Sequence, residues 1–327
     1  SSQNITGVGH QPDWVWTKSR SNATSHELYD AVRGVEKPIY SDQNSAESTN
    51  ANGLTAFGSD GFTVGAGNSV NGSGRTFVSW NWRAGGGQGS SNTAGSINTT
   101  YTSVNTTAGF SISQYVGNAT SGATVGHGLG ATPGLILVKK TSASDGWGVY
   151  HHKNTSEPAT EYLKLDTNAA TSDNLGEWND TVPTSTVFTI GNSGRTNDNG
   201  VTYIAYCFAE KKGYSKFGSY TGNGSTDGTF IYTGFKPAFV IRKRTDTTAD
   251  WRMDDNKRPG YNVIPHTLFP NEANTETSST HYKTDLLSNG FKCYGTSGNQ
   301  NADGGTYIYI AFGQSLVGTN NIPATSF

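Results

Sequence analysis

The sequence has few of the residues on which helical, disulfide-bonded and nucleic-acid-binding proteins depend. It contains one methionine, two cysteines and 12 leucines among 327 residues. So few strong helix formers argue against a mainly helical fold, and one cysteine pair provides neither a disulfide framework nor zinc-site spacing. Charged residues make up 15% of the chain and the net charge is -2, which argues against nucleic-acid binding. No apolar run approaches the length of about 20 residues that membrane insertion by a helix needs.

Residues typical of strands and tight turns are abundant instead. The chain has 42 glycines, and aromatic residues make up 11% of it. Many aromatic residues argue against disorder, while Thr, Tyr, Phe, Val and Ile favour strands and Gly favours turns. We therefore predict an all-β fold with little or no helix, in which Cys207 and Cys293 are small buried or half-buried strand residues.

Two kinds of segment recur three times along the chain. Opening segments begin at Pro12, Pro133 and Pro237, and each has three apolar residues starting two positions later and a lysine six positions later. Closing segments contain a Gly-x-Thr-aromatic pattern, and their threonines lie 64, 69 and 69 residues after the three prolines. These spacings predict three tandem antiparallel β-sandwich repeats, lectin-like or jelly-roll-like, which we expect to lie in line in an elongated protomer.

The recurring segments also predict how each strand is buried. In the second closing segment Ile204, Tyr206 and Phe208 alternate with smaller or more polar residues, so one bulky apolar face should lie on a core. We expect this strand to be central in its sheet in every repeat. The opening segments are apolar on both faces for three residues, which predicts central strands that are covered on both sides.

The repeats set the expected domain boundaries. The segments 115–118 (Tyr-Val-Gly-Asn) and 220–223 (Tyr-Thr-Gly-Asn) precede the second and third opening prolines, and residues 6–12 match only the end of such an element. The first repeat is therefore expected to be incomplete at its N-terminal side. The expected division is repeat 1 at 1–84, a Gly/Ser/Thr/Asn linker at 85–107, repeat 2 at 108–212, repeat 3 at 213–316 and a tail at 317–327.

Catalytic and metal-binding patterns are weak in this sequence. The best candidates for a proton relay or metal site are two histidines followed by scattered acids, namely His151, His152, Glu157, Glu161 and Asp166. An exposed strand end with loop acids explains them better, so we predict no hydrolytic centre, no metal site and no cofactor. The Asp-Asn-Gly and Asp-Gly-Gly segments at Asp198 and Asp303 fit turns better than calcium loops.

Aromatic residues are the remaining candidates for ligand binding. Trp147 and Trp251 occupy one repeat position, where the first repeat has His26, and a shared position indicates a structural role. Loop aromatics that occur in one copy are better candidates for stacking on sugar rings. The low-ranked glycan-binding candidates are Trp178, Tyr261 and Tyr282.

Several segments resemble a known module along nearly the whole chain. They are Pro-Asp-Trp-Val-Trp-Thr-Lys-Ser-Arg at 12–20, Leu-Tyr-Asp-Ala-Val-Arg-Gly at 28–34, Leu-Thr-Ala-Phe at 54–57, Asp-Gly-Phe-Thr at 60–63, His-Gly-Leu-Gly at 127–130, Ala-Glu-Lys-Lys-Gly-Tyr-Ser at 209–215 and the tail at 317–325. They resemble a module of tail-fibre and receptor-binding-region proteins of marine bacteriophages, including cyanophages. The resemblance implies a β-rich, lectin-like virion appendage protein, and it transfers no functional residues.

The expected function is that of a non-enzymatic structural protein of a phage virion. It would lie on the virion surface as a tail fibre or appendage and contribute to host attachment. The expected partners are further copies of the chain, with a trimer favoured, other virion proteins and a bacterial surface glycan, but no nucleic acid and no membrane. The alternatives are a capsid decoration or other virion surface protein, and a secreted bacterial carbohydrate-binding protein or glycosidase.

Overall fold

The computed structural model describes residues 1–259 and 261–313, and these residues form an all-β protein. The helices are α1 (Asn68–Asn71), α2 (Leu175–Trp178), α3 (Gly194–Asn197) and the 3-10 helix η1 (Thr280–Tyr282). The prediction of an all-β fold with little helix is confirmed. Among the described residues, no helix has the length and apolar character needed to cross a membrane.

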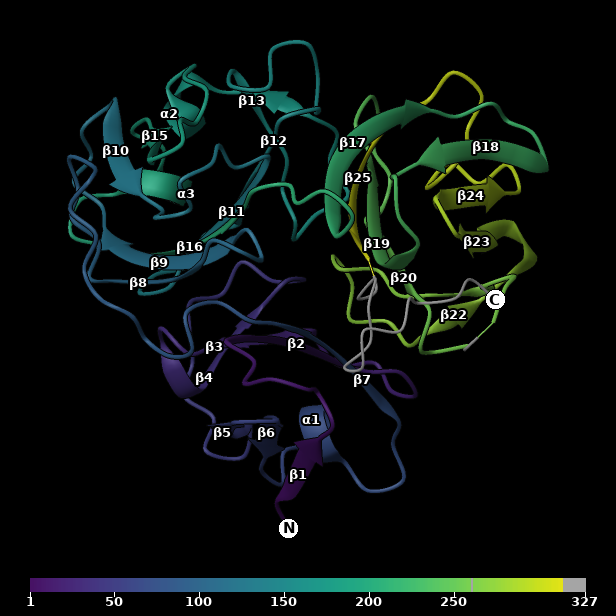
Figure 1. The fold of residues 1–327 in the computed structure, drawn as a ribbon, viewed down its shortest axis with the longest axis horizontal. Helices are drawn as coiled ribbons and strands as arrows, with labels where there is room; N and C mark the ends of the chain where they lie inside the picture. The colour runs from purple at the N-terminus through teal and green to yellow at the C-terminus, as the bar shows by residue number, and fades with distance from the viewer. Residues whose placement is uncertain (260, 314–327) are drawn as a thin grey trace.

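Three larger antiparallel sheets contain most of the strands (Figure 1). Sheet 1 has the order β4 (Gly34–Tyr40), β3 (Glu27–Asp30), β2 (Trp14–Ser19), β7 (Phe77–Trp82). Sheet 2 has the order β12 (Trp147–His151), β11 (Leu135–Lys140), β16 (Thr202–Phe208), β9 (Phe110–Val116), β8 (Tyr101–Asn105). Sheet 3 has the order β17 (Ser215–Thr221), β25 (Thr306–Gly313), β19 (Pro237–Arg244), β20 (Arg252–Asp255). We call the parts of the chain that carry these sheets unit 1 (1–84), unit 2 (85–212) and unit 3 (213–313).

Each larger sheet packs one face on a smaller sheet of the same unit. The smaller sheets are β1 (Gln3–Thr6), β6 (Gly61–Val64) and β5 (Leu54–Gly58) in unit 1, β10 (Ala123–Gly126) and β15 (Val187–Ile190) in unit 2, and β18 (Asp227–Tyr232), β24 (Gly290–Tyr294) and β23 (Thr284–Leu287) in unit 3. Two short strand pairs complete the topology: β13 (Glu161–Tyr162) with β14 (Ser172–Asp173), and β21 (His266–Thr267) with β22 (Thr277–Ser278). In unit 1, for example, Tyr29 of β3 and Phe62 of β6 share one buried cluster. The packing of two sheets face to face gives a β-sandwich-like fold.

The recurring segments coincide with paired strands. The opening segments form β2, β11 and β19, and the closing segments form β7, β16 and β25, each antiparallel to the opening strand of its unit. Gly74, Gly200 and Gly304 lie shortly before the closing strands with φ of 71°, 74° and 67°, a backbone region that favours glycine. The opening strands are central, as predicted. The closing strands are central in sheets 2 and 3, but the prediction is wrong for sheet 1, because β7 is an edge strand.

The other faces of the three larger sheets meet in one common core. Trp14 of β2 stacks on Tyr206 of β16, with ring centroids 4.6 Å apart, and Trp82 of β7 lies edge-on to Phe312 of β25 at 5.6 Å. All four side chains belong to a single buried cluster. Figure 1 shows the units grouped around this centre, so the expected arrangement in line is wrong. The bulky faces that the alternation revealed bury one another instead of covering separate cores.

The stretch 85–107 was expected to be a linker, but it packs against the units. Its residues 101–105 form β8, which pairs with β9 in sheet 2. Ile97 is buried, and the Gln88 side-chain amide donates to the carbonyl of Val32 at 3.0 Å. The polar, glycine-rich composition of this stretch suggested a linker, but many of its backbone groups are hydrogen-bonded to the units. The expected tail at 317–327 lies outside the described residues.

Buried lysines link neighbouring units around the core. Lys18, Lys139 and Lys243 are the lysines of the opening segments, and each is fully buried. Each ammonium donates to backbone carbonyls of its own unit and to one carbonyl of another unit. The acceptors in the other unit are Ala273 of unit 3 for Lys18 (3.3 Å), Asn44 of unit 1 for Lys139 (3.4 Å) and Asn168 of unit 2 for Lys243 (3.2 Å). Burial lowers the pKa of each lysine to about 8.

A second set of contacts joins the same pairs of units as the lysines do. The indole nitrogen of Trp147 donates to the carbonyl of Tyr40 in unit 1 at 2.8 Å, and that of Trp251 donates to the carbonyl of Lys164 in unit 2 at 2.7 Å. These bonds confirm the structural role predicted for both tryptophans. His26 holds the corresponding position in unit 1. Burial lowers the pKa of His26, and the nearby backbone of Phe269 in unit 3 opposes that shift.

Truncation of the common core should destabilise the whole chain. Ile308 of β25 is buried in the cluster that all three units share, so Ile308→Ala should lower the free energy of unfolding by about 2–5 kcal/mol. The exposed Val116 of β9 provides the control, and Val116→Ala should change it by less than about 0.5 kcal/mol. Urea unfolding followed by tryptophan fluorescence measures both. Equal small effects would show that Ile308 does not lie in a packed core.

The buried lysines should leave a signature in the pH dependence of stability. Their folded pKa of about 8 lies below the unfolded value, so between pH 8 and 10 the unfolded chain binds more protons and stability gains from rising pH. The buried thiol of Cys207, whose pKa is raised, acts in the opposite direction. Lys139→Met should therefore make the slope of unfolding free energy against pH less positive than in the wild type, while the exposed-site control Lys212→Met should not. Urea titrations at pH 7.5, 8.5 and 9.5 measure the slopes, and equal slopes for Lys139→Met and wild type would contradict this account.

Candidate functional site

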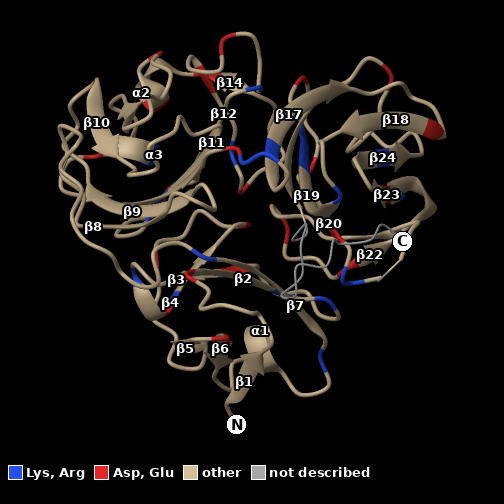
Figure 2. Ribbon diagram, in the orientation of Figure 1, with Lys and Arg blue, Asp and Glu red and all other residues tan. Residues whose placement is uncertain are grey.

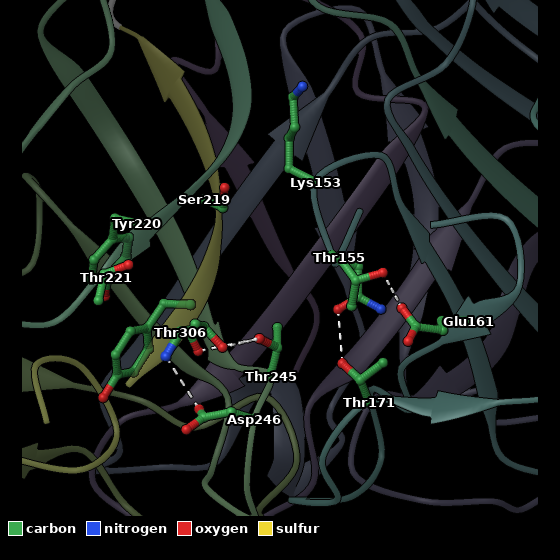
Figure 3. Close-up of a pocket in the computed structure, with 12 residues that line it drawn as sticks. Lys153, Thr155, Glu161, Thr171, Ser219, Tyr220, Thr221, Thr245, Asp246 and Thr306 are labelled. Atoms are coloured by element: carbon green, nitrogen blue, oxygen red, sulfur yellow. Dashed lines mark hydrogen bonds between the residues drawn. The ribbon is translucent and has the colours of Figure 1, made fainter. Parts of the chain in front are cut away.

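A groove of mainly polar side chains lies between units 2 and 3 (Figure 3). It has a volume of about 650 Å³ and is open to solvent. The loop after β12, the start of β13 and Thr171 just before β14 supply one wall. The strand β17, the start of β25 and the residues directly after β19 supply the other. The side chains on both walls are mainly hydroxyl, amide and carboxyl groups, so the groove suits a polar ligand.

The unit 3 wall is a connected set of hydroxyls and one carboxylate. The hydroxyls of Thr245 and Thr306 lie 2.8 Å apart, and the backbone N–H of Thr306 donates to the Asp246 carboxylate at 3.2 Å. Arg244 forms two hydrogen bonds with Asp246, at 2.8 and 2.9 Å. These bonds lower the pKa of Asp246, so its carboxylate stays ionised at neutral pH. Asp246 is thus a fixed hydrogen-bond acceptor at the edge of the groove.

The unit 2 wall offers a donor without a partner. Asn154 is 7% exposed, and its Oδ1 accepts a hydrogen bond from the hydroxyl of Thr171 at 2.8 Å. Its Nδ2 has no hydrogen-bond partner among the described residues. Beside it, the hydroxyl of Thr155 donates to the carboxylate of Glu161. A buried donor that lacks a partner is costly unless a ligand or water accepts its hydrogen bond, so the amide of Asn154 is a candidate contact for a ligand oxygen.

The groove continues into a second hollow of about 420 Å³, which shares Lys153, Ser219 and Tyr220 with the first. At its floor Nε2 of His152 lies 2.7 Å from the carbonyl of Phe217 and 3.6 Å from the carboxylate of Glu210. Burial raises the pKa of Glu210, but hydrogen bonds from His152 and from the Phe217 N–H outweigh it, and the pKa is lowered. The floor therefore carries a second ionised carboxylate.

Two exposed aromatic side chains of β18 border this second hollow. Phe230 is 44% and Tyr232 is 59% exposed, while Ile231 between them points into the core of unit 3. The Lys216 ammonium lies 5.3 Å from the Tyr232 ring centroid. The sequence reasoning missed both residues, because Phe-Ile-Tyr is apolar throughout and does not reveal which face is exposed. The signal that could have found them is the position of Ile231, whose inward direction places its two neighbours outward.

The aromatic candidates predicted from the sequence lie elsewhere. Trp178 is 1% exposed and packs edge-on to Tyr150 at 5.9 Å, so it cannot present its face to a glycan and that prediction is wrong. It is the last residue of the one-turn helix α2, whose first residue Leu175 is exposed, and the sequence could not distinguish this turn from a surface loop. Tyr261 is 72% exposed, and Tyr282 is half-buried against the guanidinium of Arg252 at 5.1 Å. Neither Tyr261 nor Tyr282 lines the groove.

The histidines and acids considered for catalysis do not form one site. His151 is buried, with Nε2 3.1 Å from the carbonyl of Tyr309, and Asp166 accepts the backbone N–H of Trp147 at 2.9 Å. Of the acids, Glu161 alone lines the groove, and Glu157 is exposed on a loop. Within residues 1–259 and 261–313, no three His, Cys, Asp or Glu side chains are placed to hold a metal ion.

The two cysteines and the two aspartates at turns lie where their contacts are structural. Cys207 and Cys293 are buried, free and part of strands, as predicted. Asp198 beside its turn pairs with the Lys140 ammonium at 2.6 Å, and Asp303 lies in an exposed turn. Residues of both charge signs are distributed along the ribbon in all three units (Figure 2).

Comparisons with known proteins place the chain in a family. No curated protein matches the chain, and no solved structure matches it either. Residues 1–315 match the domain of unknown function DUF7483. Because this match spans unit 1, unit 2 and unit 3 together, the chain belongs to the DUF7483 family.

Proposed function

We propose that the chain is a non-enzymatic appendage protein of a bacteriophage virion, which holds a bacterial surface glycan in the groove between units 2 and 3. The sequence resemblance to phage tail-fibre modules suggests the setting. The observation that carries the glycan assignment is the groove itself, with acceptors on one wall, an unpartnered donor on the other and exposed aromatic rings at one end.

The chemistry of the groove fits a sugar better than an apolar ligand. Sugar hydroxyls need both donors and acceptors, which the amide of Asn154 and the carboxylate of Asp246 supply. Sugar rings also present C–H faces that pack on aromatic rings, and Tyr232 and Phe230 are exposed for such contacts. An ammonium at Lys153 on the shared part of the groove favours a glycan with acidic substituents.

The same groups favour binding over hydrolysis. A glycosidase needs one carboxyl group whose raised pKa keeps it protonated as a general acid, beside a second ionised carboxylate. The pKa of Asp246 is lowered by Arg244, and that of Glu210 is lowered by His152 and a backbone N–H. Both carboxylates therefore suit hydrogen-bond acceptance, and we propose that the chain turns over no polysaccharide.

We further infer that the three units are tandem copies of one β-sandwich module. Equivalent opening and closing strands pair in each unit. The buried lysines also occupy equivalent positions, and each contacts the neighbouring unit at an equivalent backbone position. Duplication of one module explains both observations, because separately evolved units would not share cross-unit contacts of the same kind.

Binding should depend on the groove and not on the loop aromatics. On an array of bacterial surface polysaccharide fragments, the wild-type chain should bind a subset. Asp246→Asn and Tyr232→Ala should each weaken that binding at least tenfold, because one removes a charged acceptor and the other a stacking surface. Tyr261→Ala replaces another exposed tyrosine, which lies outside the groove, and should leave binding unchanged. Loss of binding in Tyr261→Ala alone would contradict the groove assignment, and binding of no fragment would contradict the glycan assignment.

Assembly provides a separate test of the virion setting. Fibre proteins of this kind are usually trimers, in which neighbouring copies cover sheet edges. A trimer should therefore appear in multi-angle light scattering at micromolar concentration, as three times the chain mass of 34.7 kDa. A monomer that still binds glycans would contradict the appendage proposal and favour the alternative of a secreted carbohydrate-binding protein.

A further inference from the structure

Equivalent backbone hydrogen bonds join the three pairs of units. In each bond, an N–H of one unit donates to the carbonyl of the residue that lies two positions after the buried lysine of the next unit. The bonds are Glu47 to Thr141 at 2.9 Å between units 1 and 2, Thr171 to Thr245 at 3.0 Å between units 2 and 3, and Glu276 to Arg20 at 2.9 Å between units 3 and 1. Glu47, Thr171 and Glu276 therefore occupy one equivalent position, and their side chains can be compared directly.

Between units 1 and 2 this position holds one half of an ion pair. The carboxylate of Glu47 accepts a hydrogen bond from the guanidinium of Arg33 at 2.9 Å. The Arg33 side chain is 1% exposed, and its Nε donates to the carboxylate of Asp30 at 2.6 Å. Its Nη2 donates to the carbonyl of Leu28 at 3.1 Å. The junction is thus occupied by charged groups that satisfy one another.

Between units 3 and 1 the same pair is built from equivalent residues. Glu276 accepts from Arg258 at 2.9 Å, and the Arg258 side chain is likewise 1% exposed. The Nε of Arg258 donates to Asp255 at 2.6 Å, and its Nη2 donates to the carbonyl of Met253 at 2.9 Å. Glu276 also accepts from Arg20 of unit 1 at 2.8 Å. Two of the three junctions therefore contain a buried arginine with two carboxylate partners.

Unit 2 has shorter, uncharged side chains at both positions of this pair. Arg33 and Arg258 lie three residues after the ends of β3 and β20, which pair with the opening strands of their units. Three residues after the end of the equivalent strand β12 the sequence has Asn154. Thr171 stands in place of the glutamate, and His151 stands in place of the supporting aspartate. The junction between units 2 and 3 thus lacks the arginine and both of its carboxylate partners.

The groove lies where the ion pair is missing, since Asn154, Thr171 and Thr245 all line it. In the other two junctions the arginine donates to the glutamate. Here the hydroxyl of Thr171 donates to Oδ1 of Asn154 at 2.8 Å, so the direction of the hydrogen bond is reversed. Nδ2 of Asn154, which is buried, has no acceptor among the residues described. A ligand atom that accepts from Nδ2 would take the role that the glutamate carboxylate has in the other junctions.

The charge of the surroundings favours a neutral acceptor at this place. Glu161 lies on the same wall, where its carboxylate accepts from the hydroxyl of Thr155 (Figure 3). The side chain of Lys153 points away from both of them. A ligand carboxylate beside Glu161 would meet a like charge. A hydroxyl can instead accept from Nδ2 of Asn154 and donate to a carboxylate.

We propose that Asn154 and Thr171 adapt the junction between units 2 and 3 to bind a neutral sugar, one of whose hydroxyl oxygens accepts from Nδ2 of Asn154. This inference rests on the glycan-binding function proposed above and names the sugar class and the residues that determine it. An acidic substituent of the same glycan lies toward Lys153 and not at Asn154. The proposal accounts for a polar groove at one of three otherwise equivalent junctions.

Restoring the ion pair tests the comparison of the junctions without a ligand. Asn154→Arg should lower the urea midpoint of unfolding because it buries a guanidinium without its carboxylate, and Thr171→Glu should lower it because it adds a carboxylate without its guanidinium. The double variant should unfold at a higher urea concentration than either single variant, because its two new charges pair. A double variant that is no more stable than the single variants would show that the positions are not equivalent.

Methyl glycosides test the ligand class. The probes are the methyl glycosides of glucose, galactose and mannose, each beside its uronoside, in which C6 is a carboxylate. Saturation-transfer NMR with millimolar ligand measures their affinities for the full chain. At least one neutral glycoside should bind more tightly than its uronoside.

Variants of the chain locate the sugar. Asn154→Asp removes the donor with little change in side-chain size, and it should weaken binding of the neutral glycoside at least tenfold. The double variant Asn154→Arg with Thr171→Glu should not bind it, because the new pair occupies the place of the hydroxyl. Asn118→Asp is the matched control, since Asn118 is an exposed asparagine of unit 2 that does not line the groove, and it should bind as the wild type does.

Three binding results would overturn the proposal. A neutral glycoside that Asn154→Asp binds as tightly as the wild type would lie elsewhere, although the proposed function would stand. Tighter binding of every uronoside than of its neutral partner would assign the place of the missing glutamate to a carboxylate. Absence of binding by all six glycosides would remove the sugar from this place, whereas failure of the proposed function would appear as no binding to any polysaccharide fragment of the array.

Discussion

The fold depends on one constraint, which is that three sheets with bulky apolar faces bury those faces against one another. Trp14, Tyr206 and Phe312 come from different sheets and belong to the same cluster. Because the core is shared, each unit has to be held at a fixed orientation to the other two. The buried lysines provide that orientation, since each ammonium satisfies carbonyls of its own unit and of a neighbour at once. The burial of three ammonium groups is tolerable because each has several backbone acceptors.

The grooves follow from this arrangement. Sheets that meet at a common centre diverge toward the outside, and the spaces between them collect the ends of strands and the loops that follow. Between units 2 and 3 these ends carry Thr245, Asp246 and Asn154, which gives a polar groove. Between units 3 and 1 the edge of β7 and the aromatic residues of unit 3 border a more apolar groove. One packing geometry thus produces two surfaces of different chemistry.

The sequence predicted local structure better than the arrangement of units. Alternation identified the buried face of β16, and positive-φ glycines before the closing strands produced the Gly-x-Thr signal. Alternation reveals that Tyr206 is buried, but not that its neighbour is Trp14, because contacts between units carry no periodic signal. The groove depends on such contacts, so Asn154 could not be identified. Trp178 was misassigned because a one-turn helix leaves no periodic pattern.

The cross-unit bonds of the three lysines form a closed cycle, since unit 2 contacts unit 1, unit 3 contacts unit 2, and unit 1 contacts unit 3. A linear array of repeats has two end units, each with one neighbour, and such an array can lose its ends one at a time. In a cycle every unit has two neighbours, so loss of any unit exposes the core faces of both others. A gain or loss of one unit would therefore have to open this ring, which is a constraint that linear arrays do not have.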